Sequence, residues 1–95
     1  MDSIDIFRRY LKEHHPSLVS KDWLVNVEIM EQGDIVNQEL KEIVPKQVQN
    51  LRCLVFFYIG GEDKNVVYLF QDERGIKSWA IALVRNDELV HAITL

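Results

Sequence analysis

The stretch LRCLVFFYIGGEDKNVVYLF, residues 51–70, consists of two apolar runs joined by a short polar segment. The first run, residues 51–59, has almost no polar break, which is typical of a strand covered on both faces of a sheet. The connecting segment, GGEDKN, is rich in residues that tolerate turn conformations, and so short a connection requires antiparallel neighbours. We therefore expect an antiparallel sheet with this strand in its interior.

The remaining strands are predicted on both sides of this stretch. Towards the C-terminus, a meander is expected, with strands at about 66–72, 76–84 and 88–95 separated by the turns DERG and RND. Towards the N-terminus, residues 23–31 alternate in polarity, which predicts a half-buried strand. Together these segments predict a sheet of about five strands.

An N-terminal helix is predicted over residues 3–14. Its apolar residues Ile4, Phe7 and Leu11 recur at helical spacing, and Asp2 or Ser3 can cap its first turn. Pro16 ends the helix, because a proline disfavours helical geometry in the residue before it.

Residues 34–44, DIVNQELKEIV, allow two interpretations. Their apolar residues follow the spacing of a helix capped by Asp34 and ended by Pro45: Val36, Leu40, Ile43 and Val44. In the competing interpretation the segment is a strand that pairs back on residues 23–31. The helical spacing favours the first interpretation.

These elements predict a single α+β domain over residues 1–95. The N-terminal helix, and the helix at 34–44, would pack on an antiparallel sheet of about five strands that ends in the C-terminal meander. A chain of 95 residues has little material with which to cover both faces of such a sheet. An uncovered apolar area or an edge strand is therefore a candidate interface.

The composition points to a protein without membrane segments. No stretch approaches the roughly 20 consecutive apolar residues of a membrane span, and the N-terminus lacks the apolar core of a secretory signal. The chain has one cysteine, Cys53, which fits a reducing compartment and excludes an internal disulfide. We expect a cytoplasmic protein that does not bind membranes.

No pattern in the sequence predicts an enzyme, a cofactor or a metal site. Gly60-Gly61 lies in an acidic turn and does not match a phosphate-binding loop. His14 and His15 are neighbours on a helix and point about 100° apart, so a metal site would need His91 and carboxylates brought to them by folding. Cys53 lies in an apolar strand and is expected to be a buried, unreactive side chain.

The charge distribution is the most informative feature for function. The net charge is -4, and the segment from Asp22 to Glu42 holds six acids against one base, so it alone carries -5. A negative chain disfavours nucleic acid as a partner and favours a basic protein. In size and charge the chain is similar to many bacterial immunity proteins, antitoxins and phage-encoded inhibitors, although this similarity covers no specific residues.

The favoured hypothesis is a small acidic immunity protein or inhibitor, without enzymatic activity, that neutralises a toxin or nuclease by direct binding. The residues expected to supply the charge and an apolar anchor are Glu28, Glu31, Asp34, Glu39, Glu42, Trp23 and Met30. One alternative is a homo-oligomeric subunit, in its simplest form a homodimer, that assembles through its sheet. Another is a small-molecule-binding domain that uses Tyr58, Cys53 or His91.

Overall fold

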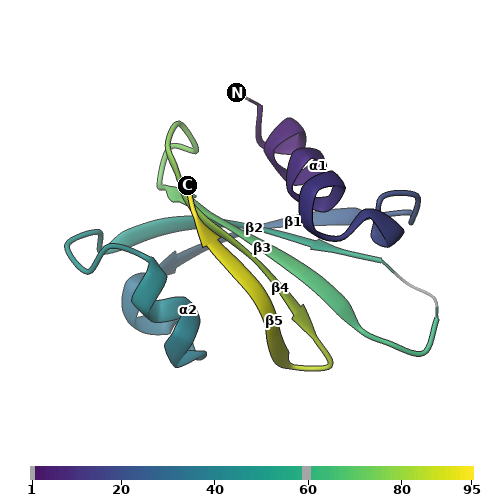
Figure 1. Cartoon of the computed structure of the whole chain (residues 1–95). Coiled ribbons are helices and arrows are strands. Elements are labelled where there is room, and N and C mark those ends of the chain that lie inside the picture. The colour runs from purple at the N-terminus through teal and green to yellow at the C-terminus, as the bar shows by residue number, and fades with distance from the viewer. Residues whose placement is uncertain (1, 59–60) are drawn as a thin grey trace.

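The computed structural model describes residues 2–58 and 61–95. The described residues form a five-stranded antiparallel sheet in the order β1-β2-β3-β4-β5, with one α-helix on each face (Figure 1). The elements are α1 (Ser3–His14), η1 (Pro16–Leu18), β1 (Leu24–Glu31), η2 (Gln32–Asp34), α2 (Gln38–Ile43), β2 (Asn50–Phe57), β3 (Asn65–Asp72), β4 (Ser78–Arg85) and β5 (Glu88–Thr94). The predicted α+β fold and its C-terminal meander are thus confirmed. The end of the predicted strand at residue 59 and the start of the predicted turn at residue 60 lie outside the described residues.

α1 covers one face of the sheet. The Asp2 carboxylate caps its N-terminus by accepting the N–H of Ile4 (3.2 Å), and Asp5 lies in the first turn, where the helix dipole favours an acid. Phe7 stacks on Phe56 of β2 with ring centroids 3.9 Å apart. The core beneath the helix consists of Phe7, Tyr10, Leu11, Leu18, Leu54, Phe56, Val67, Leu69, Ile81 and Leu83.

α2 covers only part of the opposite face. The helix at 34–44 is confirmed, but it is six residues long and Asn37, not Asp34, caps it, with the Asn37 side-chain oxygen accepting the N–H of Leu40 at 3.1 Å. Val36, which was counted in the helical spacing of this segment, precedes the helix and is 97% exposed. The core on this face consists of Ile35, Leu40, Val44, Leu51, Cys53, Phe70, Ala80, Ala82 and Val84.

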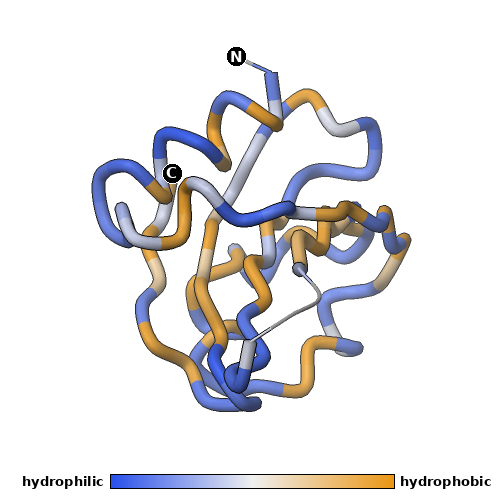
Figure 2. Tube along the Cα trace, turned by 90° about the vertical axis from the view of Figure 1, so that its right-hand side faces the viewer, coloured by the Kyte–Doolittle hydropathy of each residue, from blue (hydrophilic) through white to orange (hydrophobic). Residues whose placement is uncertain are grey.

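The strand quoted at the outset lies inside the sheet, as expected. β2 pairs with β1 and β3, and its side chains belong alternately to the core under α1 and the core under α2. Hydrophobic residues accordingly follow the inner strands, while many turns are hydrophilic (Figure 2). The sheet separates two cores, one under α1 and one beside α2.

β1 is the one strand whose burial was predicted wrongly. The alternation suggested a half-buried strand, but all its residues except Met30 are exposed. The reason is topological, because β1 is an edge strand and neither helix extends over it far enough to bury its side chains.

Among the described residues, no helix is long and apolar enough to cross a membrane.

Candidate partner-binding site: an acidic cavity beside the short helix

A cavity of about 420 Å³ opens between the α2 region and the sheet. Because α2 has only six residues, it leaves the adjoining part of the sheet uncovered. The walls are largely apolar, with Met30, Ile35, Val36, Leu40, Phe70 and Val84 among the residues that line them. Three carboxylates, Glu28, Asp34 and Asp87, line the same cavity together with Tyr68 and Asn37. An apolar hollow bordered by acids is the result.

The three acids come from three separate elements. Glu28 lies on β1 opposite Cys53 of β2, so its side chain projects from the face that carries α2. Asp34 ends η2, and Asp87 lies in the turn between β4 and β5. They are separated by up to 59 positions in the sequence, from 28 to 87, and the fold brings them to one place.

Asp34 is held by a reciprocal pair of hydrogen bonds. Its carboxylate accepts the backbone N–H of Glu31 at 2.9 Å, and the Glu31 carboxylate accepts the backbone N–H of Asp34. Such a capping box fixes both side chains at the end of β1. The Glu31 carboxylate therefore makes its hydrogen bond within the η2 turn, and Glu31 is not among the residues that line the cavity.

Asp87 is positioned by a tight hairpin turn. Asn86 and Asp87 both adopt the left-handed conformation, with φ of 51° and 68°, which is the geometry of a hairpin turn that matches strand twist. The Asn86 side chain accepts the N–H of Lys64 at 2.9 Å and donates to the Asp63 carboxylate at 3.0 Å, which ties this turn to the segment before β3. The Asp87 carboxylate also lies 3.6 Å from the Lys64 ammonium, in an exposed ion pair that contributes little stability.

The carboxylates affect the pKa values of two neighbouring side chains, Tyr68 and Cys53. Burial raises the pKa of Tyr68, and Cys53, Glu28 and Asp87 raise it further. Burial, with the charge of Glu28 added, raises the pKa of the Cys53 thiol to about 12. Cys53 is therefore protonated and unreactive at neutral pH, as the sequence suggested. Burial is the main cause of the raised pKa of Tyr68, and the carboxylates of Glu28 and Asp87, from two separate elements, add smaller increases.

Of the seven residues predicted to bind a partner, Glu31 caps the η2 turn and lies outside the cavity lining, and the other six fall into three groups. Glu28, Met30 and Asp34 line the cavity together. Glu39 and Glu42 lie on α2 with exposed side chains and outside the cavity lining. Trp23 belongs to the opposite face, where its indole N–H donates to the Leu18 carbonyl at 2.8 Å and its ring packs edge-on against Phe7.

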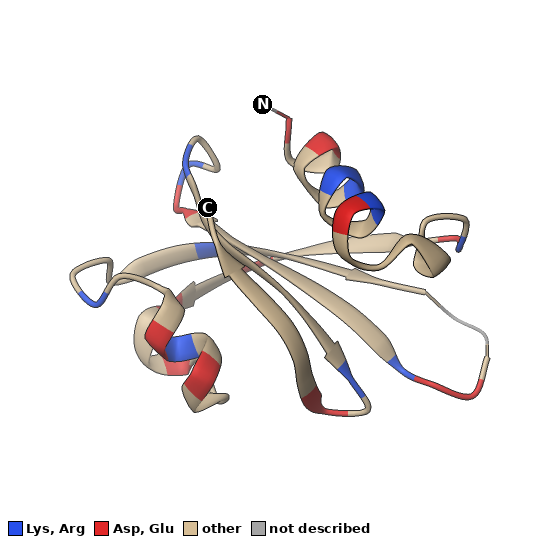
Figure 3. Ribbon diagram, viewed as in Figure 1, with Lys and Arg blue, Asp and Glu red and all other residues tan. Residues whose placement is uncertain are grey.

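Tyr68 and Asp87 are cavity residues that the sequence analysis did not select. Asp87 was part of a predicted turn, and Tyr68 was part of an apolar strand. The sequence holds one weak signal for Asp87, since Asn-Asp is a pair that favours a left-handed hairpin turn and so fixes where the carboxylate lies. No signal in the sequence places this turn beside β1 residues. Figure 3 shows the acids of α2 and of the β4–β5 turn on one side of the molecule, while the main group of basic residues lies on α1.

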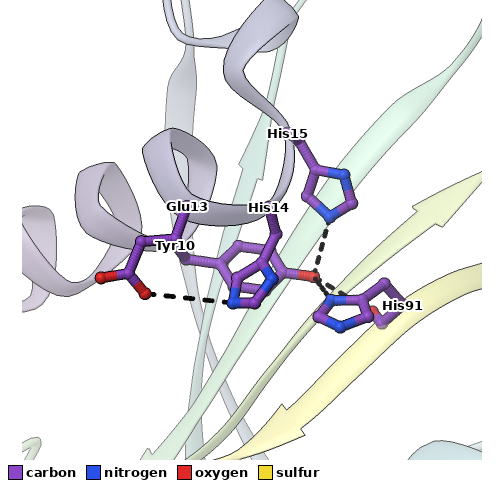
Figure 4. Close-up of polar contacts among 5 residues, drawn as sticks. All are labelled: Tyr10, Glu13, His14, His15 and His91. Carbon is purple, nitrogen blue, oxygen red and sulfur yellow. Dashed lines mark hydrogen bonds and ion pairs between the residues drawn. The ribbon is translucent and has the colours of Figure 1, made fainter.

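The histidines form a separate cluster on the α1 face (Figure 4). The Tyr10 hydroxyl is 3.1 Å from the Nδ1 of His91, the Nε2 of His15 and the carbonyl oxygen of His91. The ring centroids of His14 and His91 are 4.6 Å apart. Folding does bring His91 to the other two, yet within residues 2–58 and 61–95 no group of three or more His, Cys, Asp or Glu side chains is arranged to hold a metal ion.

Comparisons with protein-family models, curated proteins and solved structures found no match to this chain.

Proposed function

We propose that this protein is a non-enzymatic binding module whose acidic cavity takes a basic side chain of a protein partner. An immunity protein or inhibitor that masks a basic toxin or nuclease is the form of this function that the size and charge of the chain favour. The observation that carries the proposal is the convergence of three carboxylates from separate elements on one apolar hollow.

The cavity suits a lysine or arginine side chain in two ways. Its apolar wall can take the aliphatic stem, while the carboxylates accept hydrogen bonds from the charged head. Arginine fits better than lysine, because its planar guanidinium donates in several directions and loses less hydration on burial. The surrounding negative charge of the 22–42 segment would accelerate encounter with a basic surface and repel acidic proteins.

Capture from a host lysate with two variants of equal net charge tests the proposal. The cavity variant carries Glu28→Gln, Asp34→Asn and Asp87→Asn, and the control variant carries Glu39→Gln, Glu42→Gln and Glu62→Gln. Each set of three substitutions changes the net charge from -4 to -1. The amide at position 34 can still accept the N–H of Glu31, so the η2 turn is retained.

The expected result is a basic protein that the wild type and the control variant capture at low salt and that the cavity variant does not. High salt should release the partner from the wild type, because exposed charge pairs are screened. Equal loss in both variants would mean that only the overall charge matters. Equal retention in both would contradict the assignment of the cavity.

A small organic cation is a second candidate occupant, because the volume of about 420 Å³ lies within the range of small-molecule pockets. Thermal melting in the presence of free arginine or spermidine distinguishes the two candidates. A rise in melting temperature that the cavity variant loses would favour a small-molecule site. No rise, together with capture of a basic protein, would favour the protein-binding module.

A further inference from the structure

The free edge of β1 presents unpaired backbone groups and apolar side chains together. Within the described part of the chain, β1 pairs with β2 alone. Val25, Val27 and Ile29 share the α1 face of this strand and are 45%, 52% and 72% exposed. An eight-residue edge strand of this kind is a template for pairing with another strand.

The hydrogen bonds at the end of β1 show which backbone groups face the free edge. The N–H of Gln32 donates to Gln49 at 2.8 Å and so points towards the β2 side. The preceding N–H, that of Glu31, donates instead to Asp34. Because N–H direction alternates along an extended strand, and β1 has no register shift, the N–H groups of Val25, Val27 and Ile29 point to the free edge.

This alternation restricts how a second β1 strand can pair. Residues with outward N–H groups must oppose one another, so the two α1 faces lie on the same side of a joined sheet. With Val27 opposite its own copy, Val25 faces Ile29, Leu24 faces Met30, and Asn26 faces Glu28. Every apolar residue from 24 to 30 then meets an apolar residue, and the carboxylate of Glu28 meets an amide that can donate to it.

The other registers are less compatible. Centring the pair on Glu28 places two carboxylates opposite each other, and centring it on Val25 places Glu28 opposite Asp22. Centring it on Asn26 or Ile29 sets apolar residues against acids. The segment LVNVEIM is thus self-complementary about its central valine.

The other edge of the sheet lacks these properties. In β5, His91 pairs with Leu83 and Leu89 pairs with Val84, so Val90 is the extra residue of a bulge. A bulge twists an edge strand and disrupts the regular ladder that a partner would need. β5 also lies beside Tyr10 of α1, whose hydroxyl is bonded to the His91 carbonyl.

We infer that two copies of this chain pair antiparallel through β1, centred on Val27, to form a continuous ten-stranded sheet in the dimer. The backbone N–H and C=O of Val25, Val27 and Ile29 supply the hydrogen bonds between the copies. α1 leaves β1 uncovered, so the two strands of the interface lie side by side between the two α1 helices. The inference does not rest on the proposed partner, and its interface shares Glu28 and Met30 with the lining of the cavity.

Sedimentation velocity over a concentration series tests the dimer with a matched pair of variants. Val27→Lys places two ammonium groups opposite each other at the centre of the interface, whereas Val90→Lys adds the same charge on β5 at a similarly exposed valine, 45% against 52%. Wild type and Val90→Lys should reach twice the chain mass, while Val27→Lys should remain monomeric with an unchanged circular dichroism spectrum. A wild type that stays monomeric up to about 1 mM, the weak end of specific association, would overturn the inference. So would dimerisation that Val90→Lys abolishes and Val27→Lys leaves intact.

Single cysteines test the register. The Cα atoms of directly opposed residues with outward N–H groups lie about 5.5 Å apart, within the range that a disulfide bridges. Val27→Cys should therefore cross-link under mild oxidation. Asn26→Cys should not, because Asn26 lies opposite Glu28, two positions along the strand from Asn26 of the other copy. Cys53 is fully buried and does not interfere. Faster cross-linking by Asn26→Cys would refute the Val27-centred pairing.

Discussion

The two faces of the sheet are covered very differently, and we expect the difference to separate stability from binding. On one face α1 extends over 12 residues and inserts Phe7, Tyr10 and Leu11 into the core. On the other face α2 extends over six residues and buries Leu40 alone, so that part of the sheet stays open as an acidic cavity. We therefore expect the α1 face to determine the stability of the domain and the α2 face to determine what it binds.

Truncation of Phe7 should have the largest effect. Its ring stacks on Phe56 at 3.9 Å and packs edge-on against Trp23 at 5.2 Å. Phe7→Ala is expected to lower the free energy of unfolding by about 3–5 kcal/mol, through lost transfer energy and a cavity in the core. Urea denaturation followed by circular dichroism measures this loss. A loss below about 1 kcal/mol, the size of a surface effect, would contradict the assigned role of the α1 face.

Truncation of Leu40 should cost less. Leu40 is buried, but it adjoins the cavity and belongs to a helix too short to persist without packing. Leu40→Ala is expected to lower the free energy of unfolding by about 2–3 kcal/mol, near the low end for a buried leucine, because the site can relax. Hydrogen exchange should show lost protection in α2 before any loss in β2 or β3. Equal loss of protection throughout the sheet would show that α2 is as integral to the fold as α1.

The two helix caps allow a smaller test of the same comparison. Asn37→Ala removes the acceptor for the N–H of Leu40, and Asp2→Ala removes the acceptor for the N–H of Ile4. Each is expected to lower stability by about 1 kcal/mol. Only Asn37→Ala should also weaken partner binding, because Asn37 lines the cavity. Equal effects of the two variants on binding would show that α2 is not part of the binding site.

The histidine cluster predicts the smallest effect, a pH dependence confined to the α1 face. Burial and neighbouring charges lower the pKa of His15, and burial together with His14 lowers that of His91. As pH falls through the ordinary histidine pKa of about 6.5, the unfolded chain takes up protons first, so the free energy of unfolding should decrease and then level off below the folded-state pKa values. Urea unfolding between pH 7.5 and pH 5.5 should show this decrease, and the double variant His15→Gln and His91→Gln should flatten it. A stability that rises on acidification would contradict the cluster geometry.

The sequence predicted the elements well and their depth of burial less well. Turn residues and apolar periodicity located α1 and all five strands, because these are local signals. The exposure of β1 could not be predicted in this way, since alternation along a strand does not report whether a helix extends over it. The cavity was also beyond local signals. Glu28, Met30 and Asp34 could be selected from their charge and their position in the sequence. Tyr68 and Asp87 lie beside them only because the turns of the sheet bring them there and because α2 is too short to cover this place.

The measurement that tests the central claim most directly is a nuclear magnetic resonance titration of the ¹⁵N-labelled protein with a short arginine-containing peptide. A peptide of the same sequence with citrulline, which is neutral and nearly the same shape, is the control. We predict that the arginine peptide shifts the amide signals of Glu28, Asp34, Tyr68 and Asp87, that salt reverses these shifts, and that the citrulline peptide does not cause them. Shifts that map to α1, or that are equal for the two peptides, would contradict the claim that the acidic cavity on the thinly covered face is the binding site.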